Sequence, residues 1–106
     1  MNKAKIKTLL NLAQRPRKLA IGSSAVEANL KKKNVSLLLL SEDAGANLER
    51  KLQNQINTLE LKCPIIPFLT KAELGEMLNR PDVAVVGVLD KDFANGILMY
   101  TKSDGS

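Results

Sequence analysis

The apolar run VSLLLL at residues 35–40 is the feature that most constrains the fold. It stops at Ser41, Glu42 and Asp43, and it is far shorter than the roughly 20 apolar residues that a membrane-spanning helix needs. A short, continuous apolar run is typical of a strand that is buried on both faces. Because helices must cover both sides of such a strand, the sequence predicts a layered α/β protein.

Segments with helical periodicity flank this run on both sides. Ser24 with Glu27, and Thr70 with Glu73, have the spacing of a capping box, which predicts a helix start at each pair. Apolar stripes on these segments would cover the sheet. The expected helices are residues 3–14, residues 24–32, residues 45–60, the segment that follows Thr70, and a short last helix over 93–98.

Three further segments have the composition of strands. Residues 63–69, CPIIPFL, predict a short strand at or near a sheet edge, because Pro64 and Pro67 cannot donate ladder hydrogen bonds. Residues 82–89 predict another buried strand, and a fourth is expected at residues 17–20. The alternation of helices and strands predicts helices packed on both faces of one central sheet.

The chain length of 106 residues is about that of a single domain, and a hydrophobic fraction of 44% is enough for one packed core. We expect one domain over residues 1–101 and a flexible tail over residues 102–106, KSDGS. The N-terminal segment MNKAKIK lacks the apolar region and the cleavage site of a secretory signal. A cytoplasmic location is therefore expected.

The residue types present exclude several kinds of catalytic and metal site. The chain has no histidine and one cysteine, Cys63, which excludes an intramolecular disulfide, the usual Cys/His zinc sites and a Cys-His or Ser-His-Asp arrangement. The phosphate-loop and dinucleotide-binding fingerprints are also missing. Acidic residues at Glu42-Asp43 and at Asp90 and Asp92 could serve acid–base chemistry, but carboxylates after a strand more often end it or cap the next helix. No catalytic residue, metal or cofactor is expected, and Cys63 is expected to be a buried, inert thiol.

Positive charge is concentrated in the first third of the chain. Residues 1–33 contain nine Lys or Arg and one Glu, a net charge of +8, so the remaining 73 residues carry −3 of the total of +5. Such asymmetry is typical of a basic face that meets phosphates or acidic lipid, although lysine and arginine favour solvent in any protein.

The stretch IGSSAVEANLKKK, residues 21–33, could bind an anion. A helix N-terminus offers unpaired N–H groups and a partial positive charge, and Gly22 lets a ligand approach the backbone closely. Ser23 and Ser24 add hydroxyl groups, while Arg17 and Lys18 lie just before. The alternative is purely structural: the glycine turns the chain, a serine caps the helix, and the lysines complement its C-terminal dipole.

Aromatic residues are too few to form a platform for stacking bases. Phe68, Phe93 and Tyr100 are the only three, and none lies in the basic segment. Because readers of single-stranded RNA stack bases on aromatic rings, any RNA contact here should rely on backbone, shape and helix ends.

Four collinear blocks resemble a known family: NLAQRPRKLAIG, LLLLSEDAGAN, TKAELGEML and VAVVGVLDKDFAN. In order and spacing they are similar to the ribosomal-protein superfamily that includes archaeal L7Ae and eukaryotic L30e, and most similar to its small bacterial, ribosomal-protein-like branch. The resemblance covers residues 3–100. It implies a three-layer α/β/α sandwich around a four-stranded mixed sheet, with the first strand near residues 18–21.

The resemblance also implies an RNA site. The family binds kink-turn RNA with the loop and N-terminus of its second helix, and Gly22 matches the glycine of that motif. Lys32 matches a basic position late in the helix. A loop after the last strand covers the bases flipped out of the kink in that family, and Val88, Leu89 and Asp90 match this loop.

The side chains that read bases in the family are replaced in this chain. Ser24 stands in place of Asn, Ala25 in place of Glu, and Ala28 in place of Lys. Loss of a base-edge contact typically removes about 1–3 kcal/mol of discrimination. Contacts through backbone amides and lysines are therefore expected more than strict kink-turn specificity.

The expected function is non-enzymatic binding of structured RNA, either ribosomal RNA on the ribosome or a related folded RNA, with no membrane and no DNA as partner. One alternative is a protein-interaction module that kept the fold and lost specific RNA recognition, as Ala25 and Ala28 would permit. Another is an enzyme acting on a nucleotide or phosphoester, with a metal held by carboxylates such as Asp43 or Asp90. The expected RNA-binding residues are Arg17, Lys18, Gly22, Ser23, Ser24, Lys32, Val88, Leu89 and Asp90.

Overall fold

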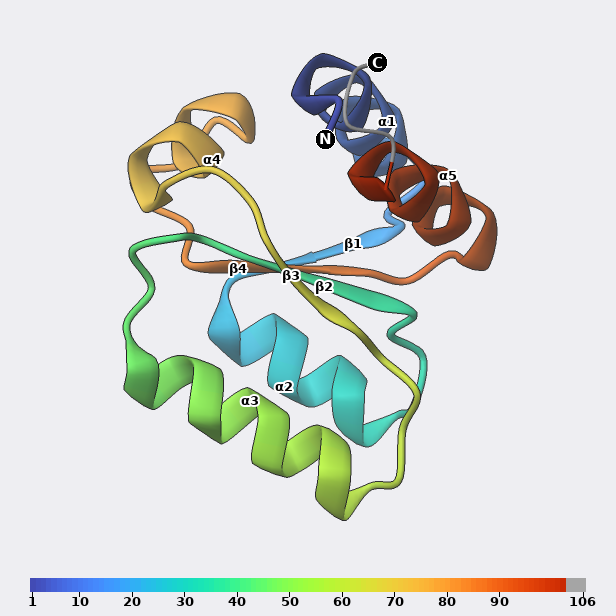
Figure 1. Cartoon of the computed structure of the whole chain (residues 1–106), viewed down its shortest axis with the longest axis vertical. Coiled ribbons are helices and arrows are strands. Elements are labelled where there is room, and N and C mark those ends of the chain that lie inside the picture. Colours follow the sequence, from blue (N-terminus) through green and yellow to red (C-terminus); the bar gives the residue numbers. More distant parts are fainter. Residues whose placement is uncertain (103–106) are drawn as a thin grey trace.

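The computed structural model describes residues 1–102, which form helices around a four-stranded sheet (Figure 1). Residues 103–106, most of the predicted tail, lie outside the described residues. Within residues 1–102, no helix combines the length and apolar character needed to cross a bilayer. In chain order the elements are α1 (Lys3–Gln14), β1 (Leu19–Ile21), α2 (Ser23–Lys31), β2 (Leu37–Leu40), α3 (Ala46–Thr58), β3 (Ile65–Pro67), α4 (Lys71–Met77), β4 (Val85–Val88) and α5 (Lys91–Lys102).

The strands form one mixed sheet in the order β1-β4-β2-β3. β4 is antiparallel to both β1 and β2, whereas β2 and β3 are parallel. Helices α1, α4 and α5 cover one face of the sheet, and α2 and α3 cover the other (Figure 1). The predicted three-layer α/β/α sandwich with a four-stranded mixed sheet is confirmed, and so is the short first strand before Gly22.

The central strand β2 explains the continuous apolar run. Leu37 and Leu39 pack into the cluster beneath α1, α4 and α5, whereas Leu38 and Leu40 pack into the cluster against α2 and α3. All four side chains are buried. Each buried leucine contributes roughly 1.5–3 kcal/mol relative to an exposed one, so a polar residue at any of these positions would be costly.

β3 lies at an edge of the sheet, as its prolines predicted. The N–H of Leu38 donates to the Pro64 carbonyl and the N–H of Phe68 donates to the Leu40 carbonyl, so this strand is tied to its one neighbour. Because Pro64 and Phe68 bond to β2, Ile65 and Pro67 face the open edge, and Pro67 has no N–H to offer an incoming strand there.

Side-chain caps fix the starts of α4 and α5. The predicted capping box is confirmed in α4, where the N–H of Glu73 donates to Thr70 Oγ1 at 3.2 Å and the N–H of Thr70 donates to Glu73 Oε1 at 3.0 Å. At α5, Asp90 Oδ1 accepts from the N–H of Phe93 at 3.0 Å. This cap starts the helix before the predicted short segment, and the helix then runs to Lys102, where the tail was expected to begin.

The capping box predicted at Ser24 and Glu27 is wrong. α2 begins at Ser23 with Gly22 as its N-cap, and no side chain of residues 1–102 caps it. Glu27 pairs instead with Lys51 of α3, at 3.1 Å between Oε1 and Nζ. The start of α2 therefore keeps its backbone donors uncapped.

Helices α1 to α4 all end in the same way, with one residue in the left-handed region: Arg17 at φ 56°, Lys33 at φ 59°, Glu60 at φ 56° and Asn79 at φ 59°. The next residue donates its N–H back to the last turn, as from Asn34 to the Asn29 carbonyl at 3.3 Å. Glycine and asparagine adopt this conformation readily, whereas other residues lose roughly 1–2 kcal/mol. Three of the four helix ends therefore carry a charged residue where glycine would fit best.

Candidate functional site

The start of α2 exposes backbone donors at the end of β1. Gly22 adopts φ 91° and ψ 161°, a conformation that is essentially confined to glycine. The first helical residues, Ser23, Ser24 and Ala25, have no intrahelical acceptor for their N–H groups, and no other acceptor for them is present within residues 1–102. A Cβ placed on Gly22 would meet nothing within 4 Å, so the space in front of this backbone is open.

The connection between α4 and β4 lies beside this helix start. The N–H of Gly22 donates to the carbonyl of Val85, the first residue of β4, at 2.9 Å. The exposed residues 79–82 lead into that strand and include Arg80. We call this surface, formed by the start of α2 and residues 79–84, the Gly22 end. Sequence reasoning missed the contribution of residues 79–84 because it began the last strand at residue 82, although Asn79 and Pro81 are typical of a turn.

Three predicted site residues lie at the opposite end of the sheet. In the β1–β4 pair, Leu19 lies opposite Val88 and Ile21 opposite Val86, so β1 runs from Val88 toward Gly22. The N–H of Leu89 donates to the carbonyl of Lys18, beside the start of β1. Val88, Leu89 and Asp90 are therefore far from the start of α2, and their predicted role as a loop covering a base bound there is wrong.

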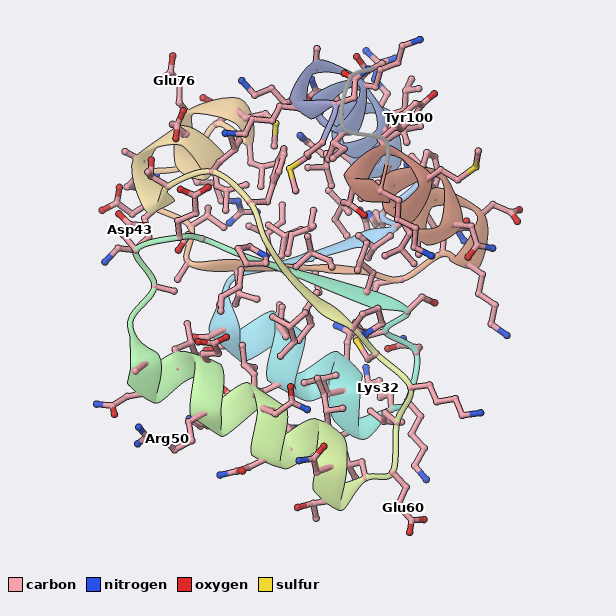
Figure 2. All side chains as sticks on the ribbon, viewed as in Figure 1. Lys32, Asp43, Arg50, Glu60, Glu76 and Tyr100 are labelled. Carbon is pink, nitrogen blue, oxygen red and sulfur yellow. The ribbon has the colours of Figure 1, made fainter. Side chains whose placement is uncertain are left out.

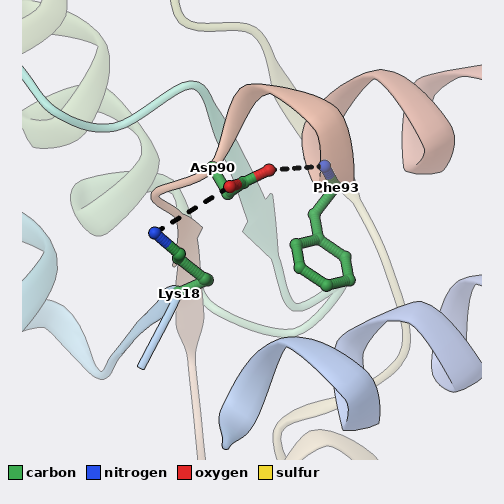
Figure 3. A network of polar contacts seen from close by, with 3 residues as sticks. All are labelled: Lys18, Asp90 and Phe93. Carbon is green, nitrogen blue, oxygen red and sulfur yellow. Dashed lines mark hydrogen bonds and ion pairs between the residues drawn. The ribbon is translucent and has the colours of Figure 1, made fainter. Parts of the chain in front are cut away.

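The same three residues have structural roles. Val88 is 0% exposed in the core and cannot pack against a base. Asp90 caps α5 at Phe93 and lies 3.9 Å from Lys18, measured between Oδ2 and Nζ (Figure 3). Lys18 therefore lies beside an acidic side chain at the start of β1.

The predicted cations also lie away from the Gly22 end. Lys32 follows the last turn of α2, about 13 Å from its start at 1.5 Å per residue, and Figure 2 shows it at the far end of that helix. Arg17 lies in the turn before β1. The predicted site therefore divides between two surfaces: Gly22, Ser23 and Ser24 at one end of the sheet, and Arg17, Lys18 and Lys32 at the other.

Charge differs sharply between these two surfaces. Residues 79–84 of the Gly22 end include Arg80 and Asp82, and the loop after β2, whose Ser41 N–H donates to the Ala84 carbonyl, adds Glu42 and Asp43. The opposite end, which we call the lysine end, is formed by residues 15–18, 31–33, 60–62 and 90–92. It carries eight cations against three acids: Arg15, Arg17, Lys18, Lys31, Lys32, Lys33, Lys62 and Lys91 against Glu60, Asp90 and Asp92.

The carboxylates and the thiol considered for chemistry serve the fold. Asp43 and Asp90 each accept a hydrogen bond from a backbone N–H at a helix start. Cys63 is buried, and burial raises the pKa of its thiol to about 11, so the thiol stays protonated at neutral pH. Within residues 1–102, no three His, Cys, Asp or Glu side chains are grouped so that they could hold a metal ion.

Asp43 makes stability depend on pH. Its Oδ1 accepts a hydrogen bond from the N–H of Lys71 at 2.8 Å, and this bond holds the pKa of the carboxyl below its usual value of 3.8. Because the folded-state pKa is lowered, the stabilisation is fully present above the unfolded-state pKa and is lost as the pH falls through the folded-state pKa. We expect Asp43→Ala to lower the melting temperature at neutral pH and to have little effect in strong acid. Equal losses at both pH values in thermal unfolding would contradict this.

The chain belongs to the Ribosomal protein L7Ae/L30e/S12e/Gadd45 family, which it matches over residues 4–97. It is 33% identical to RNA-binding protein YlxQ from Bacillus subtilis (strain 168) over 90 residues, covering 85% of this chain and 88% of that protein. It is 27% identical to RNA-binding protein YlxQ from Enterococcus faecium over 93 residues, covering 88% of this chain and 87% of the relative. A solved structure of a protein with unknown function from Bacillus halodurans C has the same fold, with a TM-score of 0.80, 29% identity, and coverage of 91% of this chain and 95% of that one.

Proposed function

We propose that this chain is a non-enzymatic protein that binds structured RNA through the Gly22 end. The observation that carries the proposal is the uncapped start of α2, where the N–H groups of Ser23, Ser24 and Ala25 have no acceptor within residues 1–102. Membership of the family and the similarity to two proteins named as RNA-binding support the same function. The proposal includes a cytoplasmic ribonucleoprotein role on ribosomal RNA or a related folded RNA.

The proposed contact is with the RNA backbone. Free N–H groups and the partial positive charge of a helix start favour a phosphate, and the hydroxyls of Ser23 and Ser24 can add hydrogen bonds. The exposed connection to β4 also carries a cation, Arg80. Ala25 and Ala28 present no polar group to a base edge, so recognition of a kink would depend on its shape and on its phosphates.

The second candidate is a protein-interaction module. The observation that favours it is the mixed charge at the Gly22 end, where Asp82 lies near Arg80 and acidic residues continue into the loop after β2. Salt distinguishes the two functions. Contacts with phosphates weaken steeply as salt is added, because bound counterions are released, whereas contacts between a surface of mixed charge and a protein depend less steeply on salt.

The direct test is a titration of the protein with a kink-turn RNA and with a plain duplex at low and moderate salt. We expect tighter binding to the kink-turn and a loss of affinity for both RNAs as salt rises. Equal, salt-sensitive binding would contradict recognition of the kink but keep RNA binding. No binding to either RNA would favour the protein-interaction module.

Ser24→Asp tests whether the start of α2 is the contact surface. A carboxylate in the first turn stabilises a helix, so the fold should be kept or strengthened, but it repels a phosphate. We expect RNA affinity to fall by about tenfold or more, equivalent to about 1.4 kcal/mol. The matched control is Asn47→Asp, because Asn47 is exposed at the second position of α3 after Gly45, which adopts φ 93° and ψ 150° as an equivalent N-cap. Equal effects of the two variants would contradict a specific role for α2.

A further inference from the structure

The lysine end contains a hollow that the proposed function does not use. It has a volume of about 440 Å³, within the ~300–1,000 Å³ typical of ligand pockets, and lies between α5, the turn after α2 and the connection from α3 to β3. Each of these three segments contributes one lysine: Lys91, Lys33 and Lys62. Three cations from separate parts of the chain therefore surround one concave surface.

The inner surface of the hollow is partly apolar and partly hydrogen-bonding. Val35 and Leu98 supply apolar contact, whereas Ser36 and Asn95 supply a hydroxyl and an amide. No aromatic side chain lines it. A ligand here would meet positive charge at the rim and mixed chemistry inside, without a ring on which to stack.

The end of α2 places Lys33 at the hollow. Lys33 ends α2 in the left-handed conformation at φ 59°, where glycine would be favoured. The side chain is exposed, so it makes no core packing contact that would offset the cost of this backbone conformation. The same conformation ends α1, α3 and α4, so it is a common helix end of this fold that fixes where Lys33 leaves the backbone beside the hollow.

We propose that this hollow is a second RNA site, which holds the sugar–phosphate backbone of a segment beyond the one at the Gly22 end. The proposal rests on the RNA binding proposed above but uses a separate surface. The lysines at the rim complement phosphates, and Lys31 and Lys32 extend the positive charge beside it. The Ser36 hydroxyl and the Asn95 amide can bond to a ribose 2′-hydroxyl, which distinguishes RNA from DNA.

RNA is a better occupant than an added peptide strand. The sheet edge beside the hollow is β3, where Pro67 lacks an N–H on the open side and leaves only Ile65 to donate from the strand. The eight cations of the lysine end outnumber its three acids, and one of these acids, Asp90, caps the start of α5 and lies beside Lys18. The absence of aromatic rings from the lining predicts contact with backbone and ribose rather than recognition of a base.

The test compares two RNAs that share one kink-turn, one with short arms and one with an arm of about 16 base pairs, the length that a small double-stranded RNA-binding domain spans. The variant is K33Q/K62Q/K91Q. The matched control is K3Q/K7Q/K102Q, which removes the same charge from exposed positions on α1 and α5 outside the hollow. We expect the hollow variant to lose the extra affinity for the long-armed RNA and to bind the short-armed RNA as the wild type does. The slope of log K against log salt should fall by about 2–3, at 0.7–0.9 per phosphate contact.

A third variant separates strain from charge. Lys33→Gly should raise the melting temperature, because glycine relieves the left-handed strain, and should still weaken binding of the long-armed RNA. NMR should show the amides of Ser36 and Asn95 shifting when the long-armed RNA is added. These results together would support a lysine at the end of α2 that is kept for RNA.

Several results would overturn the second site. In one such result, the hollow variant binds the long-armed RNA as tightly as the wild type does, while Ser24→Asp abolishes binding. This result would leave the proposed function intact. Another is an equal loss in the hollow and control variants, which would mean that only overall charge matters. Shifts at Ser36 and Asn95 produced by a poly-glutamate peptide but not by RNA would assign the hollow to an acidic protein partner. If the hollow variant alone loses binding and Ser24→Asp does not, the second site is supported and the Gly22 end is overturned.

Discussion

Gly22→Ala should weaken RNA binding by about tenfold or more, equivalent to about 1.4 kcal/mol, and should also destabilise the fold by about 1–3 kcal/mol. The backbone at Gly22 lies in a region that is essentially confined to glycine, so alanine must shift it. A new Cβ would meet no protein atom within 4 Å, and the whole penalty therefore comes from the backbone. Any shift would reorient the free N–H groups of Ser23 and Ser24.

Gly45→Ala provides the matched control. Gly45 is the N-cap of α3 at φ 93° and ψ 150°, and a Cβ there would also meet nothing within 4 Å. Both variants should lose similar stability in chemical denaturation, but only Gly22→Ala should lose RNA affinity, measured at a temperature where both remain folded. An equal loss of RNA affinity would contradict the assignment of the site to α2.

Gly75→Ala should have the second large effect, because it acts on the connection beside the Gly22 end. A Cβ on Gly75 would lie 2.6 Å from the carbonyl oxygen of Pro81 and 2.7 Å from that of Arg80. Backbone atoms cannot rotate away as a side chain can, so residues 79–82 must move off α4. We expect a loss of about 1–3 kcal/mol from overpacking, and weaker RNA binding because Arg80 is displaced.

Gly96→Ala is the control for this variant. Gly96 lies within α5, where a Cβ would approach only Leu9 Cδ1, at 3.2 Å, and that side chain can adjust. Alanine is favoured over glycine inside a helix by about 1 kcal/mol, so this variant should be neutral or slightly stabilising and should bind RNA normally. A destabilisation as large as that of Gly75→Ala would contradict the role assigned to the backbone contacts at Pro81.

The layers of the fold could be predicted because each element carries a periodicity that reports burial. The run at residues 35–40 predicted a strand buried on both faces, and the alternating packing of Leu37 and Leu38 explains why it did. The edge position of β3 followed from Pro64 and Pro67. These are properties of single segments, and they do not depend on how the segments are connected in space.

The site could not be assembled from the sequence because strand direction is not encoded in periodicity. The resemblance to the family assigned Val88 to a loop over the start of α2, but β4 is antiparallel to β1, so the end of β4 lies beside the start of β1 at Lys18. The two predicted capping boxes show a similar limit of prediction from the sequence. Thr70 and Ser24 have the same spacing to a glutamate, but Glu27 forms an ion pair with Lys51 on another helix and no capping box forms at Ser24.

The separation of charge between the two ends of the sheet also has a consequence for the kinetics of association. A long-range field attracts a polyanion toward the positive pole first, so encounters should begin at the lysine end, before short-range contacts form at Gly22. Salt would then slow capture more than it speeds release from the backbone amides. The molecule is polarised along its sheet, and the order of its contacts with a large RNA would follow from that polarity.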